Sequence, residues 1–113
     1  MNSAKNFLTK LAANSTSGKN GVTQIMVAAK EGKTHILRTM IEAGGNVNAK
    51  DKDGFTALMF AAARGRDDCV KLLLSGGADP NAKDRWGRTA IMVAQEGAKD
   101  SAVAILRAAG AKE

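Results

Sequence analysis

Residues that commonly carry chemistry are scarce in this chain of 113 residues, which has one histidine, one cysteine and no tyrosine. His35 and Cys69 occupy nearly equivalent places, one residue apart in register, in adjacent segments of the repeat described below. Stacked helices lie about 8–10 Å apart, whereas a nucleophile and its base must approach within about 2.6–3.2 Å. A metal site needs three or four converging ligands. We therefore expect no catalytic dyad, no metal and no cofactor, and we do not expect an enzyme.

Paired carboxylates and glycines also favour structural roles. Asp67 and Asp68 resemble a catalytic pair, but they stand at the start of a predicted helix, where acidic side chains favour the helix dipole. Cys69 falls on the apolar stripe of that helix, so a buried thiol is expected, while His35 is expected to be exposed. The glycines recur periodically, and no G-K-[ST] motif follows a strand, so a phosphate-binding loop is not indicated.

The charge balance is basic, with 17 basic and 11 acidic residues and a net charge of +6. Such a balance suits contact with nucleic acid or with an acidic protein surface. The signs alternate, as in "KDKD" and "RGRDD", so a solvated surface is an open alternative. A lone cysteine fits a reducing compartment, no apolar run approaches the roughly 18 residues of a membrane span, and the N-terminus lacks the apolar core of a secretory signal. Cytoplasmic localisation is therefore expected.

The stretch "DRWGRTAIM", residues 84–92, contains the only tryptophan. Trp86 stands between Arg85 and Arg88 in a predicted turn, and Thr89 follows as a candidate helix N-cap. A large ring in an exposed turn has two explanations, a partner that covers it or a neighbouring turn against which it packs.

The turn belongs to an internal sequence repeat. The length of the repeat is the interval from Gly21 to Gly54. Glycine, threonine, methionine and alanine each recur at this interval, at Gly21, Gly54 and Gly87, Thr23, Thr56 and Thr89, Met26, Met59 and Met92, and Ala28, Ala61 and Ala94. Each unit predicts a turn, a first helix capped by the threonine, a short glycine break and a second helix. The second helices carry apolar residues at helical spacing, as in Ile36, Leu37, Met40 and Ile41, and in Cys69, Val70, Leu73 and Leu74.

Glycines are expected to end the helices. Gly44, Gly77 and Gly110 fit the left-handed residue that follows a helix C-terminus. The break between helices falls at Gly32 and Gly65, but Ala98 takes this place in the third unit, one residue after Gly97. A different inter-helix turn is therefore expected in that unit.

The two ends of the chain are expected to cap the stack. Phe7, Leu8 and Leu11 stand one period before Met40, Ile41 and Gly44, which predicts a half-unit whose helix covers the first full unit. Arg107 and Gln95 make the last unit more polar, as a terminal repeat requires. The expected divisions are 1–19 for the capping half-repeat, 20–52 and 53–85 for two repeats, and 86–113 for the last repeat and cap. With both ends capped, a monomer is expected.

The units "DKDGFTALMFAAARG" and "CVKLLLSGGADPNAKD" resemble ankyrin repeats, over residues 20–113 and in part over residues 3–14. The resemblance implies an all-α repeat fold, a solenoid of stacked helix-turn-helix units joined by β-turn or hairpin loops. Two family positions differ: the usual proline is Gln24, Ala57 or Ala90, and the usual histidine is Met26, Met59 or Met92. The hydrogen bond between that histidine and the capping threonine is therefore expected to be absent, with a thioether packed in its place.

The resemblance also implies a protein–protein interaction module that binds its partner with its hairpin tips and first helices. The matching positions are Lys52, Asp53, Phe55, Ala63 and Arg64, then Arg85, Trp86, Arg88 and Glu96, and in the first unit Lys19, Asn20, Val22, Lys30 and Glu31. The arginines favour an acidic segment in the partner, whereas Phe60 is expected in the core. One alternative function is nucleic-acid binding through the basic surface with Trp86 stacked on a base. Local packing of Phe55 and Trp86 against arginines also stays open.

Overall fold

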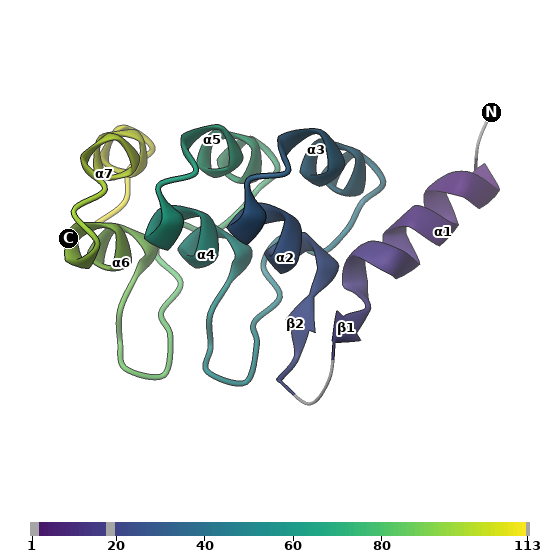
Figure 1. The fold of residues 1–113 in the computed structure, drawn as a ribbon, viewed down its shortest axis with the longest axis horizontal. Coiled ribbons are helices and arrows are strands. Elements are labelled where there is room, and N and C mark those ends of the chain that lie inside the picture. Colours follow the sequence, from purple (N-terminus) through teal and green to yellow (C-terminus); the bar gives the residue numbers. More distant parts are fainter. Residues whose placement is uncertain (1–2, 18–19, 113) are drawn as a thin grey trace.

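The structure is a computed structural model that describes residues 3–17 and 20–112. Its elements are α1 (Ser3–Asn14), β1 (Thr16–Ser17), β2 (Val22–Thr23), α2 (Gln24–Glu31), α3 (Thr34–Glu42), α4 (Ala57–Arg64), α5 (Asp67–Ser75), α6 (Ala90–Glu96) and α7 (Asp100–Ala108). The two short strands pair antiparallel, and the hairpin loops project from one side of the helices (Figure 1). Within the described residues, no helix is long and apolar enough to cross a membrane.

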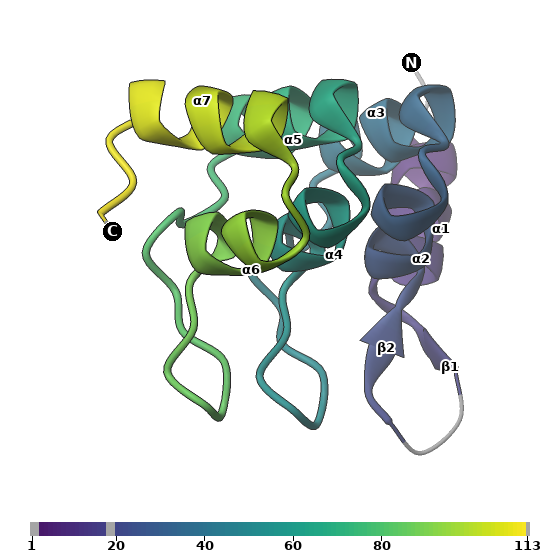
Figure 2. The same cartoon turned by 60° about the vertical axis from the view of Figure 1, so that its left-hand side comes forward.

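The helices form two layers. The first helices α2, α4 and α6 pack side by side in one layer, and the second helices α3, α5 and α7 form the other (Figure 2). Ala28, Ala61 and Ala94 recur in the first helices and are at most 3% exposed, so their small side chains let neighbouring helices approach closely. The expected all-α ankyrin-like solenoid is confirmed.

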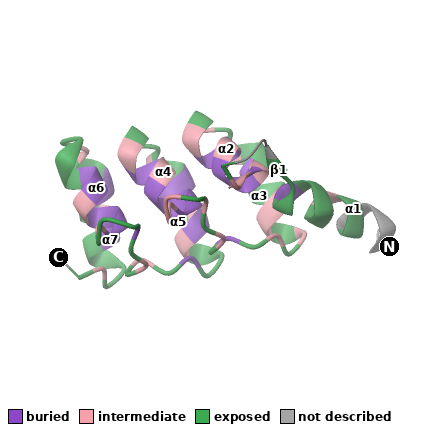
Figure 3. Ribbon diagram, turned by 90° about the horizontal axis from the view of Figure 1, so that it is seen from below, coloured by how far each residue is buried: buried purple, intermediate pink, exposed green. Residues whose placement is uncertain are grey.

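The core is aliphatic and lies between the layers; Figure 3 marks the buried residues along the helices. First helices contribute Ile25, Leu58 and Ile91, each at most 1% exposed, and second helices contribute Leu37, Leu73 and Leu106, each fully buried. Phe60, expected in the core, is only half-buried and packs against its edge. Phe55 and Phe60 thus lie at the border of the core, and Trp86 lies at the surface.

Two of the three capping threonines act as predicted. Thr23 and Thr56 accept the backbone N–H of the residue three positions later, each at 3.3 Å. Thr89 makes no such bond, and its buried hydroxyl has no hydrogen-bond partner. In the first unit Met26 Sδ accepts the Thr23 N–H at 3.4 Å, so the thioether retains a weak form of the bond that was expected to be absent.

The glycine stops also behave as predicted, with φ of +88°, +94° and +88° at Gly44, Gly77 and Gly110. Ala98 adopts φ of +55°, the same left-handed conformation as Gly32 and Gly65. The third inter-helix turn therefore keeps the hand of the other two, and the expected difference is confined to a slightly shorter helix before it. A non-glycine residue in this region is strained.

Asparagine side chains connect successive units. Asn14, Asn48 and Asn81 each use Oδ1 to accept a backbone N–H from the following unit. The donors are Asn46, Asp79 and Lys112, at 2.8, 2.8 and 2.9 Å. Asn14 therefore attaches the end of α1 to the first full repeat in the way that the later asparagines attach their own units.

The packing of the N-terminal helix differs from the prediction. Its C-terminal end is anchored through buried Ala13 and the Asn14 bond, and the helix runs away from the stack toward its N-terminus (Figure 1). Phe7, Leu8 and Leu11 are 62%, 63% and 53% exposed. The expectation that these residues cover the first unit is wrong. The helix also continues to Asn14 instead of stopping at the position equivalent to Gly44.

Candidate partner-binding site

The site is built on the hairpin turns, which buried or half-buried aspartates hold rigid. Asp51 Oδ1 accepts the backbone N–H groups of Asp53 and Phe55, both at 2.9 Å. Asp84 Oδ1 accepts those of Trp86 and Arg88 in the next hairpin, again at 2.9 Å. Such side-chain-to-backbone bonds fix a turn, so the backbone from which each ring projects is held in place.

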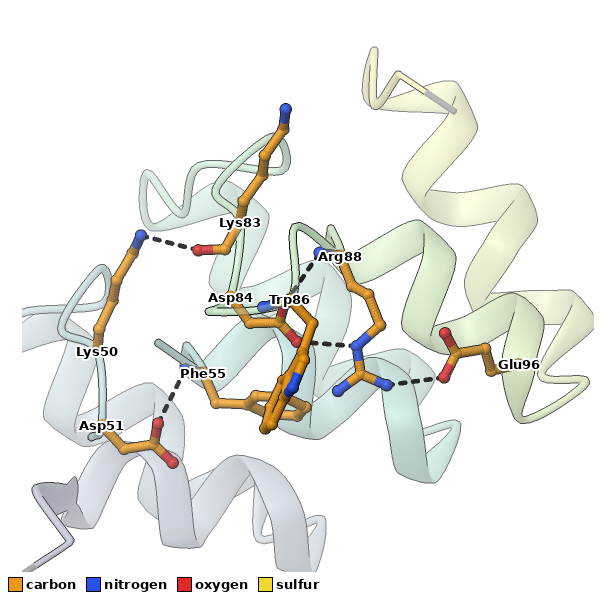
Figure 4. A network of polar contacts seen from close by, with 8 residues as sticks. All are labelled: Lys50, Asp51, Phe55, Lys83, Asp84, Trp86, Arg88 and Glu96. Atoms are coloured by element: carbon orange, nitrogen blue, oxygen red, sulfur yellow. Dashed lines mark hydrogen bonds and ion pairs between the residues drawn. The ribbon is translucent and has the colours of Figure 1, made fainter. Parts of the chain in front are cut away.

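Backbone bonds hold neighbouring hairpins in register. The Lys52 N–H donates to the Asn20 carbonyl at 2.8 Å, and the Arg85 N–H donates to the Asp53 carbonyl at 2.9 Å. Lys50 Nζ adds a bond of 3.0 Å to the Lys83 carbonyl (Figure 4). The hairpins therefore present their side chains as one edge.

Arg88 lies at the centre of this edge. Its Nε binds Asp84 Oδ2 at 2.9 Å and its Nη1 binds Glu96 Oε1 at 2.8 Å. The guanidinium carbon is 5.5 Å from the Phe55 ring centroid and 5.3 Å from that of Trp86. Figure 4 shows the guanidinium beside these two rings, with the carboxylates on either side.

Further contacts extend the arrangement in both directions. Arg85 lies 5.2 Å from the Trp86 ring centroid, and its Nη1 binds Asp53 Oδ1 at 3.1 Å. The Phe55 and Phe60 centroids are 5.1 Å apart with a 56° tilt, and Lys30 Nζ is 6.0 Å from the Phe60 centroid. We name this alternation of cations and rings the cation–aromatic row; it comprises Lys30, Phe60, Phe55, Arg88, Trp86 and Arg85.

The residues of the cation–aromatic row differ in how far their side chains are exposed. Phe55, Phe60 and Arg88 are half-buried, whereas Trp86 is 61% exposed although the turn and two guanidiniums hold it in place. Cation–π contacts at exposed sites contribute about 0.5–1 kcal/mol each. An exposed indole that contacts two arginines is the feature of the row most suited to contact another molecule.

The electrostatics of the row depend on Asp84, which is only 6% exposed. Burial alone raises the pKa of its carboxyl, but hydrogen bonds from Arg88 and Trp86 together with the guanidinium charge outweigh burial, so the pKa is lowered from its ordinary value. The hydrogen bond to Asp84 is also the main cause that raises the pKa of Arg88. Both groups are therefore charged at neutral pH.

The structure joins six of the predicted site residues through direct contacts: Asp53, Phe55, Arg85, Trp86, Arg88 and Glu96. Lys52 and Arg64 are exposed, and no carboxylate of the described residues pairs with them. Of the first-unit positions, Lys30 joins the row, Glu31 pairs with Lys33 at 3.2 Å, and Lys19 lies outside the described residues. Ala63 and Val22 are half-buried, and Asn20 contributes its carbonyl.

Two members of the site are not identified by the sequence. Phe60 is predicted in the core because it lies inside a first helix, yet it extends the row toward Lys30. Asp84 is recognisable only as a periodic turn residue, although it also binds the Arg88 side chain. The repeat itself offers a signal for Asp84, because Asp51 stands one period earlier.

Cys69 and His35 lie apart from this edge. Cys69 is 1% exposed, and burial raises the pKa of its thiol against smaller lowering effects from Thr34 and Arg66. His35 is exposed. Among residues 3–17 and 20–112, no three side chains of His, Cys, Asp or Glu converge as metal ligands would.

Comparison with known proteins identifies the repeat. The family model described as "Ankyrin repeats (3 copies)" matches residues 1–84 and again residues 25–112. A search of curated proteins gave no match to this chain. Ankyrin repeats generally mediate protein–protein interaction and are typically not enzymes. The two matches cover nearly the whole sequence, and the chain belongs to the ankyrin-repeat family.

Proposed function

We propose that this chain binds a partner protein through the concave edge formed by its hairpin tips and the ends of its first helices, without catalysing a reaction. The residues of that edge are Lys52, Asp53, Phe55, Arg64, Arg85, Trp86, Arg88 and Glu96. One observation carries the proposal: Trp86 is 61% exposed yet fixed by the Asp84 turn and by two stacked guanidiniums. Tryptophan is enriched at the centres of protein–protein interfaces.

The rigidity of Trp86 favours affinity. Tryptophan and arginine are over-represented among the residues that dominate binding energy. A side chain already ordered before binding loses little further entropy, whereas a mobile one costs about 0.5–1.5 kcal/mol. Local packing and partner binding are thus compatible, because the contacts with Arg85 and Arg88 prepare the ring and still leave much of it exposed.

The partner segment is proposed to be acidic, for a reason that differs from the sequence argument. Arg88 is neutralised by Asp84 and Glu96, and Arg85 pairs with Asp53. Lys52 and Arg64 remain exposed and without an ionic partner among the described residues. These two side chains, in a protein of net charge +6, would pair with the carboxylates of a partner that also presents an apolar group to Trp86.

A single chain carries the complete edge, so the binding unit in this proposal is the monomer. The buried free thiol of Cys69 suits a reducing compartment, and we place the protein in the cytoplasm. Nucleic-acid binding is the less favoured function. Two guanidiniums already lie within 5.3 Å of the Trp86 centroid, so a stacked base would compete with them for the ring faces.

Affinity capture from nuclease-treated native lysate tests the proposal. Wild type is compared with a Phe55→Ala/Trp86→Ala double variant and with Lys71→Ala, a control at an exposed position of α5. The melting temperatures of all three baits are first measured and must be equal. A partner held by wild type and by the control, and lost from the double variant, would support the edge as the site.

The captured protein is then purified and titrated, and the double variant is expected to bind it at least about 30-fold more weakly, since a hot-spot truncation costs about 2 kcal/mol or more. Equal capture by all three baits would exclude the edge. Steeply salt-dependent binding of single-stranded nucleic acid that requires Trp86 would instead favour the alternative function.

A further inference from the structure

The N-terminal end of the stack carries most of the exposed apolar surface. Of the five large hydrophobic side chains exposed among the described residues, four lie at this end: Phe7, Leu8, Leu11 and Ile36. The fifth is Trp86. The opposite end exposes polar residues, including Gln95, Glu96 and Arg107. Exposed apolar surface concentrated at one end of a molecule is a candidate interaction site.

The apolar stripe of α1 has the pattern of a second helix that lacks its first helix. Phe7 and Leu8 stand two periods before Leu73 and Leu74 of α5. Leu73 is fully buried and Leu74 is half-buried, and α5 packs against α4 of its own unit. In the described part of the chain no helix stands in that relation to α1, so its stripe, defined as residues 7, 8 and 11, lies open.

A groove lies open at the same end. Its walls are Gln24, Val27 and Ala28 of α2 and Ile36 and Met40 of α3, and its volume is about 100 Å³. Ile36 and Met40 stand one period before Cys69 and Leu73. Inside the stack those two positions are 1% and 0% exposed, whereas Ile36 is 44% exposed and Met40 is half-buried. In an inner unit of the stack, the preceding unit covers these positions. Here α1 does not line the groove, so the groove stays open.

We propose that a second copy of this chain covers this end, with α1 of each copy lying in the α2–α3 groove of the other about a two-fold axis. An unpartnered amphipathic helix and an unfilled groove on one face are the two halves of an isologous contact. One such pairing buries both stripes and both grooves, so assembly stops at two copies. Head-to-tail stacking would instead place the apolar end against the polar surface of α6 and α7, so it is disfavoured.

Charge contributes little to this contact. The groove is bordered by Glu31 and Lys33, whose side chains pair with one another at 3.2 Å, while α1 contains Lys5 and Lys10 and no acidic residue. The pairing therefore depends on the apolar residues of the stripe and the groove. Each copy as a whole carries +6, so the long-range force is repulsive and salt that screens it favours pairing.

This pairing departs from the monomer expected from two capped ends, because one end is not capped. It leaves the binding edge free, since Trp86 lies on the hairpin before α6, at the far end of the stack from α1 (Figure 1). A pair would therefore present two copies of the edge and bind a two-site partner with avidity.

Sedimentation velocity of the full chain over roughly 1–300 μM, a range that spans micromolar affinity, tests the proposal. The expected mass rises with concentration from 11.7 kDa toward twice that value and no further. A mass that stays at 11.7 kDa throughout would overturn the pairing and leave the stripe to a different occupant. Larger species that grow without limit would overturn the two-fold arrangement.

Two variants locate the contact. Leu8→Glu/Leu11→Glu alters the stripe and Ile36→Glu alters the groove; all three positions are exposed in the single chain, so folding is expected to persist and is checked by circular dichroism. Each variant is expected to remain monomeric, whereas the control Trp86→Ala pairs as wild type does. Unchanged pairing in either variant would overturn its half of the interface. Pairing weakened by salt between about 0.05 and 0.5 M would contradict an apolar contact between like-charged copies.

Discussion

Both oxygens of the Asp84 carboxylate bind Arg88: Oδ1 accepts the backbone N–H and Oδ2 accepts the side-chain Nε–H, each at 2.9 Å. The first bond closes the hairpin turn, and the second holds the guanidinium beside the rings of Phe55 and Trp86 (Figure 4). One buried side chain therefore controls both the shape of the turn and the order of the aromatic edge.

Asp84→Ala is expected to destabilise the fold by about 1–3 kcal/mol, because it leaves two part-buried backbone N–H groups and the Nε–H of Arg88 without their acceptor. Urea unfolding followed by Trp86 fluorescence measures this, since Trp86 is the only tryptophan. Asp51→Ala is the matched control. Asp51 makes the same two turn bonds without an arginine side chain, so its cost is expected to be smaller. Equal costs would show that the bond to the Arg88 side chain adds nothing.

The stability of the fold is expected to fall in acid partly through Asp84. Its folded pKa lies below the ordinary value of about 3.9, so between the two values the unfolded chain binds more protons than the folded one. The stabilisation is therefore complete above about pH 4 and is lost as the pH falls through the folded pKa. The melting temperature of Asp84→Asn should fall less steeply below about pH 4 than that of wild type.

Asp53→Asn is the control for this pH dependence. Asp53 also pairs with an arginine, but the pair is largely exposed, and such pairs contribute little to stability. This variant is expected to follow the wild-type pH profile. If it flattens the acid limb as much as Asp84→Asn does, the buried carboxylate is not the relevant group.

The repeat made most of the architecture predictable, because each structural position occurs three times in one chain. Three equivalent glycines indicated the helix stops, and the recurring aspartates marked the turns. The place of Phe55 and Trp86 beside one another on adjacent hairpins also follows, since stacking brings together residues that stand close to one period apart.

Other features have no periodic signal. Arg88 binds Glu96, eight residues away and within its own unit, and the equivalent positions carry Phe55 and Ala63. The sequence therefore suggested free arginines where the structure has neutralised ones. The direction of α1 was also missed. The period identifies α1 as a second helix, but the side that such a helix buries is set by the first helix before it, which the described part of the chain does not contain.

Ala98→Gly is expected to stabilise the protein by about 1 kcal/mol. Residue 98 has a left-handed backbone conformation, which strains alanine and does not strain glycine. Differential scanning calorimetry should show a higher melting temperature. The reverse change at the equivalent position, Gly65→Ala, places a Cβ 3.0 Å from Lys99 Cδ at φ of +66° and should lower it. A lower melting temperature for Ala98→Gly would contradict the strain at this turn.

Leu73→Ala tests whether the layered core behaves as one unit. Leu73 is fully buried at the centre of the second-helix layer, and comparable truncations cost about 2–5 kcal/mol. Because small domains have only about 5–15 kcal/mol of stability, and because each repeat is stabilised by its neighbours, the loss should shift the whole unfolding transition. Lys71→Ala, at an exposed position of the same helix, should stay within about 0.5 kcal/mol of wild type. An unchanged transition for Leu73→Ala would show that α5 does not pack as described, whereas separate transitions for individual repeats would show that the stack lacks cooperativity.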